Sequence, residues 1–183
     1  MLEDFSAPTP ARGMPHPLPE GIQGVYRLIA VAHIERHKAL IALCGLCGCR
    51  IGEALSIKPC DFDLTEMLLT IRGKGDKTRI VPISTAAWES LEIPMARAFT
   101  SGGGEIVNLK DRFARRVITN LGEKADLRRS IRSHDLRATF ASEVYNNTLD
   151  IRLVQELLGH SSSQTTELYI LVNRAKMREA VEL

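Results

Sequence analysis

The sequence lacks any long, uninterrupted apolar run. No stretch approaches the roughly 20 apolar residues that a membrane-spanning helix needs. Its opening residues, MLEDFSAPTPARGMPHPLP, also lack the hydrophobic segment that directs a chain to secretion. These two absences argue against a membrane protein and lead us to expect a cytoplasmic protein with no membrane partner.

A strong excess of charge of either sign is also missing. The 24 lysines and arginines are nearly balanced by 22 acidic residues, which gives a formal net charge of +2. A balance this close to neutral does not by itself indicate a nucleic-acid partner. The length of 183 residues and the hydrophobic content of 44% fit one ordinary domain with a packed core.

A complete metal-binding pattern is absent as well. The four cysteines are Cys44, Cys47, Cys49 and Cys60, and three of them lie within LCGLCGC. No second CxxC and no HxxxH motif supplies the remaining ligands of a tetrahedral zinc site. Because free cysteine packs as a small hydrophobe, we expect reduced cysteines in the core, with no metal and no small-molecule cofactor.

The residues that are present divide the chain into two parts. Residues 1–19 carry five prolines and predict an extended tail or linker, and residues 20–183 predict one folded domain. Helical spacing and capping residues predict helices over 20–32, 37–47, 51–57, 84–94, 108–121, 133–144 and 150–159, and a last helix that holds Tyr169. Within these, Ser84, Ser133 and Asp150 are the expected N-caps, and Pro94 is expected to stop its helix. Two β-rich runs, 67–73 and 77–84, predict a hairpin with 61–64 as a third strand. The expected fold class is therefore mainly α with a small antiparallel β-sheet.

The segment Ser133-His134-Asp135-Leu136-Arg137 is the first candidate for chemistry. Residues three apart share a helix face, so His134 and Arg137 project together from a first helical turn. The helix N-terminus adds unpaired N–H groups and a positive dipole end, which together suit a phosphate. The alternative is a capped surface helix with a solvated arginine.

The segment Cys49-Arg50-Ile51-Gly52-Glu53 offers a second guanidinium. Arg50 follows a glycine-broken helix end and could reach the same phosphate through bidentate hydrogen bonds. Glu53, one turn later, could pair with Arg50 or orient a nearby histidine. The alternative is an ordinary helical salt bridge.

Three further residues are weak candidates when each is taken alone. Lys74 lies between glycines in RGKGDK, where it could contact a phosphate or deliver a proton, and the alternative is a solvated turn. The loop is not a Walker phosphate loop, because GxxxxGK[ST] is missing. His160 follows Gly159, an expected helix C-cap, and Tyr169 comes nine residues later.

The combination of these motifs is far more specific. In this order and context, the chain resembles the tyrosine recombinase, or phage integrase, family from about Glu20 to Lys176. CRIGEAL is similar to the family's first-arginine motif, RGKGDKTRIVPI to its lysine hairpin, HDLRATFASE to its HxxR motif, and LLGHSSSQTTELY to the segment that leads to its nucleophile. One departure is CGCR where TGLR is usual, which puts Cys49 in place of leucine and leaves Arg50 in position.

The resemblance implies site-specific DNA recombination, for integration or excision of a mobile element, by strand cleavage and rejoining. In this chemistry Tyr169 forms a 3′-phosphotyrosyl intermediate, and Arg50, Arg137 and His160 stabilise the phosphate. His134 accepts the proton of Tyr169, Lys74 protonates the leaving 5′-oxygen, and Glu53 supports the site. The implied partners are double-stranded DNA and other protomers in a DNA-bound tetramer, with a nucleoid-associated location. We also expect residues 1–19 to be a linker or tail from an N-terminal DNA-binding domain, which family members usually have and which is absent from this sequence.

Other functions stay open at this point. A type IB topoisomerase shares the phosphotyrosine chemistry, although the spacing in LLGHSSSQTTELY favours a recombinase. A noncatalytic DNA-binding regulator and a simple interaction domain are the alternatives from other classes, and the intact tyrosine and arginines argue against both.

Overall fold

The computed structural model describes residues 16–73 and 78–159. Within them the chain is mainly helical with one small antiparallel sheet, which confirms the expected fold class. The helices are α1 (Ile22–Val31), α2 (Glu35–Gly45), α3 (Ile51–Ser56), α4 (Thr85–Thr100), α5 (Asp111–Lys124), α6 (Ser133–Thr148) and α7 (Ile151–Leu158). The strands are β1 (Phe62–Asp63), β2 (Leu68–Arg72) and β3 (Thr78–Pro82), preceded by a short 3₁₀ helix, η1 (Pro59–Asp61). No helix in these ranges is both long enough and apolar enough to cross a membrane.

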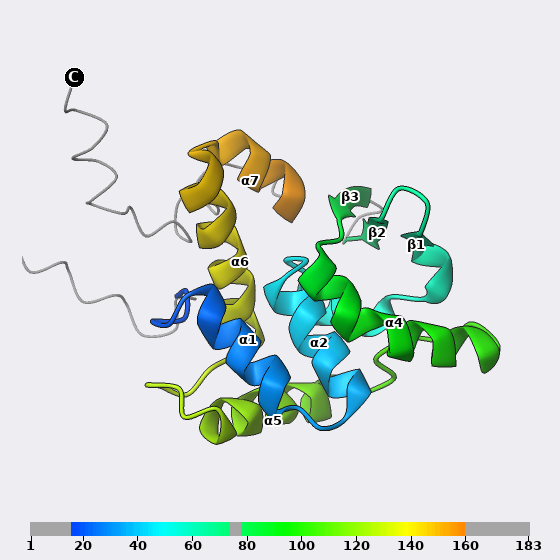
Figure 1. The fold of residues 1–183 in the computed structure, drawn as a ribbon, viewed down its shortest axis with the longest axis horizontal. Helices are drawn as coiled ribbons and strands as arrows, with labels where there is room; N and C mark the ends of the chain where they lie inside the picture. Colours follow the sequence, from blue (N-terminus) through cyan, green and yellow to red (C-terminus); the bar gives the residue numbers. More distant parts are fainter. Residues whose placement is uncertain (1–15, 74–77, 160–183) are drawn as a thin grey trace, which may run out of the picture.

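Helix α2 forms the centre of the core. Every residue from 39 to 45 is buried, as expected for a helix that is apolar on all sides. Helices α1, α4 and α6 pack around it, and Figure 1 shows α2 between α4 on one side and α1 and α6 on the other. Cys44, Cys47 and Cys49 lie in this core as free thiols, as expected, whereas the free thiol Cys60 is exposed. Burial raises the pKa of Cys44 and of Cys47 to about 12, so both thiols stay protonated.

The sheet has the strand order β1-β2-β3, and both pairings are antiparallel. This arrangement confirms the expected hairpin and the expected third strand. Leu69, Ile71 and Val81 are buried on one face of the sheet. Arg79 lies opposite Ile71 in the register and points to the same buried face. The tip of the hairpin, 74–77, lies outside the described residues.

Helix α4 contradicts the expected stop at Pro94. Ser84 caps the helix as predicted, with its Oγ accepting from the Ala87 N–H at 3.3 Å. The helix then continues through Pro94 to Thr100. A proline inside a helix costs about 3 kcal/mol, but Leu91, Pro94 and Ala98 are buried on the face that packs toward α2. Tertiary packing therefore outweighs the local preference of proline.

The start of α6 corrects a second expectation. Ser133 is the first residue of the helix rather than its N-cap, which is Arg132. The Asp135 carboxylate accepts a hydrogen bond from the Arg132 backbone N–H at 2.9 Å. An acidic residue in the first turn of the helix thus satisfies the backbone N–H of the N-cap residue. The hydroxyl of Ser133 is buried and has no hydrogen-bond partner within residues 16–73 and 78–159. At α7 the expectation is confirmed, because Asp150 caps the N-terminus and Gly159 ends the helix in the left-handed conformation.

The described residues that precede α1 contact α6. The backbone N–H of His16 donates to Asp135, and the backbone N–H of Leu18 donates to the Thr139 hydroxyl at 2.8 Å. Arg129 donates to the carbonyl of His16 at 2.7 Å and to the Asp135 carboxylate at 3.0 Å. Residues 16–18, which the sequence assigned to a linker, thus lie against the helix that carries His134 and Arg137.

Candidate active site

Arg50 and Glu53 form an ion pair, one of the arrangements that the sequence left open. Arg50 is the N-cap of α3, and Glu53 is the third residue of that helix. The Glu53 carboxylate accepts from the Arg50 backbone N–H at 2.8 Å and from its Nη1 at 2.9 Å. Glu53 is 7% exposed and the Arg50 side chain is 43% exposed. The carboxylate therefore holds in place a guanidinium that still reaches solvent.

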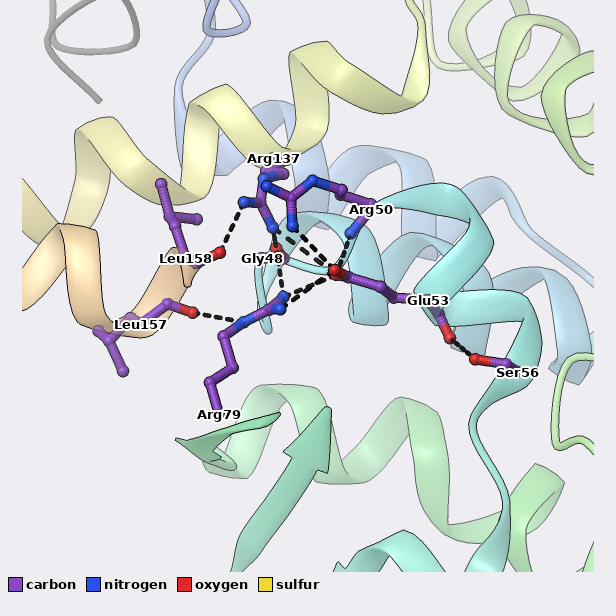
Figure 2. Close-up of polar contacts among 8 residues, drawn as sticks. All are labelled: Gly48, Arg50, Glu53, Ser56, Arg79, Arg137, Leu157 and Leu158. Atoms are coloured by element: carbon purple, nitrogen blue, oxygen red, sulfur yellow. Dashed lines mark hydrogen bonds and ion pairs between the residues drawn. The ribbon is translucent and has the colours of Figure 1, made fainter. Parts of the chain in front are cut away.

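Arg79 also binds Glu53, and the sequence reasoning missed it. Its Nη1 and Nη2 donate to the two Glu53 oxygens at 3.1 and 2.7 Å, in a bidentate pairing (Figure 2). Its Nε donates to the Leu157 carbonyl at 2.8 Å. The sequence signal was the two-residue period of the strand, in which Arg79 shares a face with the apolar Val81 and Ile83. In the structure Arg79 is buried on that face, while its neighbour Ile80 is 58% exposed.

Arg137 joins the same cluster from α6. Its Nη1 donates to the Gly48 carbonyl and lies 3.8 Å from a Glu53 oxygen, and its Nη2 donates to the Leu158 carbonyl at 2.7 Å. The Arg137 side chain is only 1% exposed. Figure 2 shows Arg137 and Arg79 approaching Glu53 from α6 and from β3. The structure thereby brings the first-arginine motif and the HxxR motif together around one carboxylate.

Gly48 shapes the turn on which this meeting depends. Its φ is 66°, in the region that side chains rarely adopt, and a Cβ there would lie 2.5 Å from the Phe140 ring. Its carbonyl accepts from Arg137 and, at 3.4 Å, from Arg79. Only glycine fits this close approach of the backbone to α6.

The electrostatics of the cluster follow from its composition. Burial alone raises the pKa of Glu53, but hydrogen bonds from Arg79 and Arg50 outweigh burial and hold that pKa at about 2. Glu53 therefore stays ionised. Among the described residues, three guanidiniums surround one carboxylate, and this net positive charge favours an anion.

His134 lies one helical turn before Arg137 but in different surroundings, because its side chain is exposed. Partial desolvation of the ring lowers the pKa of His134, and the positive charges of Arg115, Arg137 and Arg132 lower it further. The imidazole is therefore neutral at neutral pH, which suits a proton acceptor.

The remaining predicted residues, Lys74, His160 and Tyr169, lie outside the described residues. Two of the described elements next to them in the sequence, β3 and α7, contact the cluster. Strands β2 and β3 precede and follow the segment that contains Lys74. Helix α7, which ends just before His160, contacts β3, and its last carbonyls accept hydrogen bonds from Arg79 and Arg137. Among the described residues, no group of three or more His, Cys, Asp or Glu side chains is placed to hold a metal ion.

A family model described as the phage integrase family matches residues 23–176, most of the 183-residue chain. The chain belongs to the phage integrase family. This match confirms the resemblance drawn from the motifs.

Individual relatives agree with this placement among the tyrosine recombinases of the family. The chain is 32% identical over 165 residues to the tyrosine recombinase XerC of Thermodesulfovibrio yellowstonii, covering 81% of this chain and 54% of the relative. The XerA recombinase crystal structure matches with a TM-score of 0.79 and 33% identity, covering 91% of this chain and 64% of that one. The XerH site-specific recombinase bound to difH substrate, a pre-cleavage complex, matches with a TM-score of 0.74 and 26% identity, covering 99% and 57%. The chain spans about half the length of the curated relatives it matches.

Proposed function

We propose that this chain performs site-specific DNA recombination by cleaving and rejoining strands through a 3′-phosphotyrosyl intermediate on Tyr169. The observation that carries the proposal is the convergence of Arg50, Arg79 and Arg137 on the single carboxylate of Glu53. The transition state of phosphoryl transfer places extra negative charge on the nonbridging oxygens. Preorganised guanidiniums stabilise such charge without needing to reorganise during the reaction.

Two of these arginines are the proposed phosphate ligands. Arg50 is the more accessible, since 43% of its side chain is exposed. Arg137 is 1% exposed, so a phosphate reaches its guanidinium only when neighbouring atoms move aside in the DNA complex. The planar fork of each guanidinium matches two phosphate oxygens. His160 is the proposed third donor.

The proton transfers are assigned by the same reasoning. The Tyr169 oxygen attacks the phosphorus, the bond from phosphorus to the 5′-oxygen breaks, and the protein becomes linked to the 3′-phosphate. Tyrosine has an ordinary pKa of about 10, so a base is needed, and the neutral imidazole of His134 takes its proton. Lys74 gives a proton to the departing 5′-oxygen. A 5′-hydroxyl of another strand then attacks the phosphotyrosine and releases Tyr169, so the energy of the phosphodiester is conserved.

Double-stranded DNA is the proposed substrate. The related XerH structure holds its difH substrate, which supports a duplex partner for this chain. Exchange between two duplexes cleaves four strands, so four protomers in a DNA-bound tetramer are the proposed assembly. A cytoplasmic, nucleoid-associated location follows from that substrate. We also propose that residues 20–183 are the catalytic unit and that residues 1–19 join it to a unit that holds DNA.

Strand transfer tests the phosphotyrosyl chemistry of the proposal, and plasmid relaxation separates recombination from topoisomerase activity. A pool of duplexes randomised around a central nick is incubated with the chain, and sequences linked covalently to protein are enriched. The captured duplex is then offered a second duplex that carries a free 5′-hydroxyl. Joining of strands from the two duplexes is the expected result. Relaxation of a supercoiled plasmid without joining would favour a topoisomerase. The absence of any covalent capture would contradict both the recombinase and the topoisomerase hypotheses.

A further inference from the structure

Arg79 connects several parts of the cluster from β3. It is 7% exposed. Its guanidinium donates to both oxygens of Glu53, to the Leu157 carbonyl and to the Gly48 carbonyl. A Cβ on Gly159 would lie 3.0 Å from the Arg79 Cδ, so the backbone at the end of α7 packs directly on this side chain. One arginine of β3 therefore contacts α3, the turn before α3, and the end of α7.

Each of these contacts leads to a proposed site residue. Glu53 holds Arg50, and the Gly48 carbonyl also accepts from Arg137. Leu157 lies three residues before His160 in the sequence. We propose that Arg79 is a positioning residue for DNA cleavage, which fixes these elements relative to one another and does not touch the DNA. This inference rests on the function proposed above.

The charges explain why cleavage requires this position. Glu53 is buried, and a buried carboxylate must find partners. Arg79 supplies two charge-assisted hydrogen bonds and so neutralises Glu53 from the side away from solvent. Without Arg79, the Glu53 carboxylate would attract the guanidiniums of Arg50 and Arg137 more strongly. The two guanidiniums would then be less available to a phosphate.

The geometry explains why lysine is a poor substitute. The two Nη atoms of Arg79 bind Glu53 while its Nε binds the Leu157 carbonyl. A planar guanidinium with five donors satisfies both directions at once, whereas an ammonium group at the end of a flexible stem does not hold them in one plane. Arg79→Lys should therefore keep the charge and lose the alignment of β3 with α7.

The test compares covalent cleavage and DNA affinity on the captured, nicked duplex at saturating protein. Arg79→Met should slow formation of the adduct by about 10²-fold, the usual consequence of small misplacements in an active site, while the Kd for the duplex stays unchanged. Arg79→Lys should fall between Arg79→Met and wild type. Adding Glu53→Gln to Arg79→Met should recover part of the lost rate, because a neutral amide no longer competes for Arg50 and Arg137. A purely structural role predicts instead that the double variant is no faster than Arg79→Met.

A matched control separates loss of stability from loss of positioning. Arg27 also ties distant segments together, by donating to the carbonyls of Ala125 and Asp126, but it lies outside the cluster. Arg27→Met should lower Tm and leave the cleavage rate of the folded protein unchanged. If Arg79→Met shows no cooperative unfolding transition, the role of Arg79 is tested with Arg79→Lys, by the same measurements of Tm and of cleavage rate.

The outcomes are distinguishable. Wild-type cleavage by folded Arg79→Met, or by Arg79→Lys where that variant decides, would overturn the role of Arg79 while leaving the proposed function intact. Loss of DNA affinity in proportion to loss of cleavage would also overturn it, since that result means direct contact with DNA. A wild-type chain that forms no adduct would contradict the proposed function, and this inference would fall with it.

Discussion

Arg137 donates a hydrogen bond to the carbonyl oxygen of Gly48, which lies 89 residues earlier in the chain and two residues before Arg50. This bond joins the HxxR helix to the turn that presents the first arginine. It forms only because Gly48 adopts a positive φ and lets the backbone approach Phe140 on α6. The relative placement of the two proposed phosphate ligands therefore depends on a residue that has no side chain.

Gly48→Ala should destabilise the fold by about 2 to 5 kcal/mol, from the strain of a side chain at positive φ and the clash with Phe140. Gly52→Ala is the matched control, because a Cβ there meets nothing within 4 Å. It should stabilise α3 by about 0.5 to 1 kcal/mol. Urea denaturation followed by circular dichroism measures both. Equal stability of Gly48→Ala and wild type would contradict the role given to this turn.

Much of the fold was readable from local patterns. The i, i+3 spacing of Arg50 and Glu53 indicated that they could pair, and the sequence of the hairpin predicted two paired strands. Asp150 was identified correctly as an N-cap, because it directly precedes residues whose apolar side chains recur at helical spacing. These features depend on residues within one or two helical turns or across one hairpin.

The features that were missed depend on tertiary contacts. Pro94 stays inside α4 because its face of the helix is buried against α2, which local propensity does not report. Arg79 bonds with residues that are 26 and 78 positions away, so no local spacing indicates its partners. The burial of Arg137 is of the same kind, since the Gly48 and Leu158 carbonyls come from other elements. The phase of β3 alone carried a readable signal for Arg79.

Glu53 should make stability depend on pH in acid. Its pKa in the folded chain is about 2, below its ordinary 4.5, so its stabilising contribution is complete above the ordinary value and is lost as pH falls toward 2. That depression corresponds to about 3 kcal/mol. The difference in unfolding free energy between wild type and Glu53→Gln should be constant from about pH 7 to pH 5.5 and should shrink progressively below that range.

The control for this measurement is an exposed carboxylate. Glu89 is exposed on α4, and Glu89→Gln should change stability by no more than about 0.5 kcal/mol. A difference between wild type and Glu53→Gln that grows as pH falls would have the wrong sign. It would mean that the Glu53 carboxylate is not held ionised by its arginines.

His134 should titrate below its ordinary pKa of 6.5, because desolvation and the nearby arginines favour the neutral imidazole. Removing one of these charges in Arg115→Met should raise the pKa of His134. Arg116→Met, the adjacent arginine on α5, is the matched control and should leave that pKa nearly unchanged. Titration of the imidazole by NMR in the free protein measures both shifts. The same pKa for His134 in Arg115→Met and wild type would disprove the assigned cause.

Substituting lysine at either proposed phosphate ligand should reduce cleavage more than binding. Loss of one preorganised donor to the transition state costs about 10² to 10³ in rate. Arg50→Lys and Arg137→Lys should each lose cleavage on this scale while keeping their charge, because ammonium is a point charge and cannot span two phosphate oxygens. Single-turnover adduct formation and a parallel binding titration separate the two effects. Cleavage at the wild-type rate by Arg137→Lys would count against the phosphate clamp.

The identity of the nucleophile is the central claim. The chain has three tyrosines, Tyr26, Tyr145 and Tyr169. Tyr26 lies in α1 and is 40% exposed, and Tyr145 lies in α6, two turns after Arg137. Only Tyr169 follows His160 at the spacing of the family motif. Tyr26→Phe and Tyr145→Phe should therefore form the covalent adduct normally, and they serve as matched controls for Tyr169→Phe.

The most direct test is to trap the adduct on a nicked duplex, whose short 5′-hydroxyl fragment diffuses away and prevents resealing, and to map the modified peptide by mass spectrometry. We predict that the nucleotide is attached to Tyr169, within the segment TTELYILV, and that Tyr169→Phe abolishes the adduct while retaining DNA binding. A nucleotide attached to Tyr26 or Tyr145, or an undiminished adduct in Tyr169→Phe, would contradict the account.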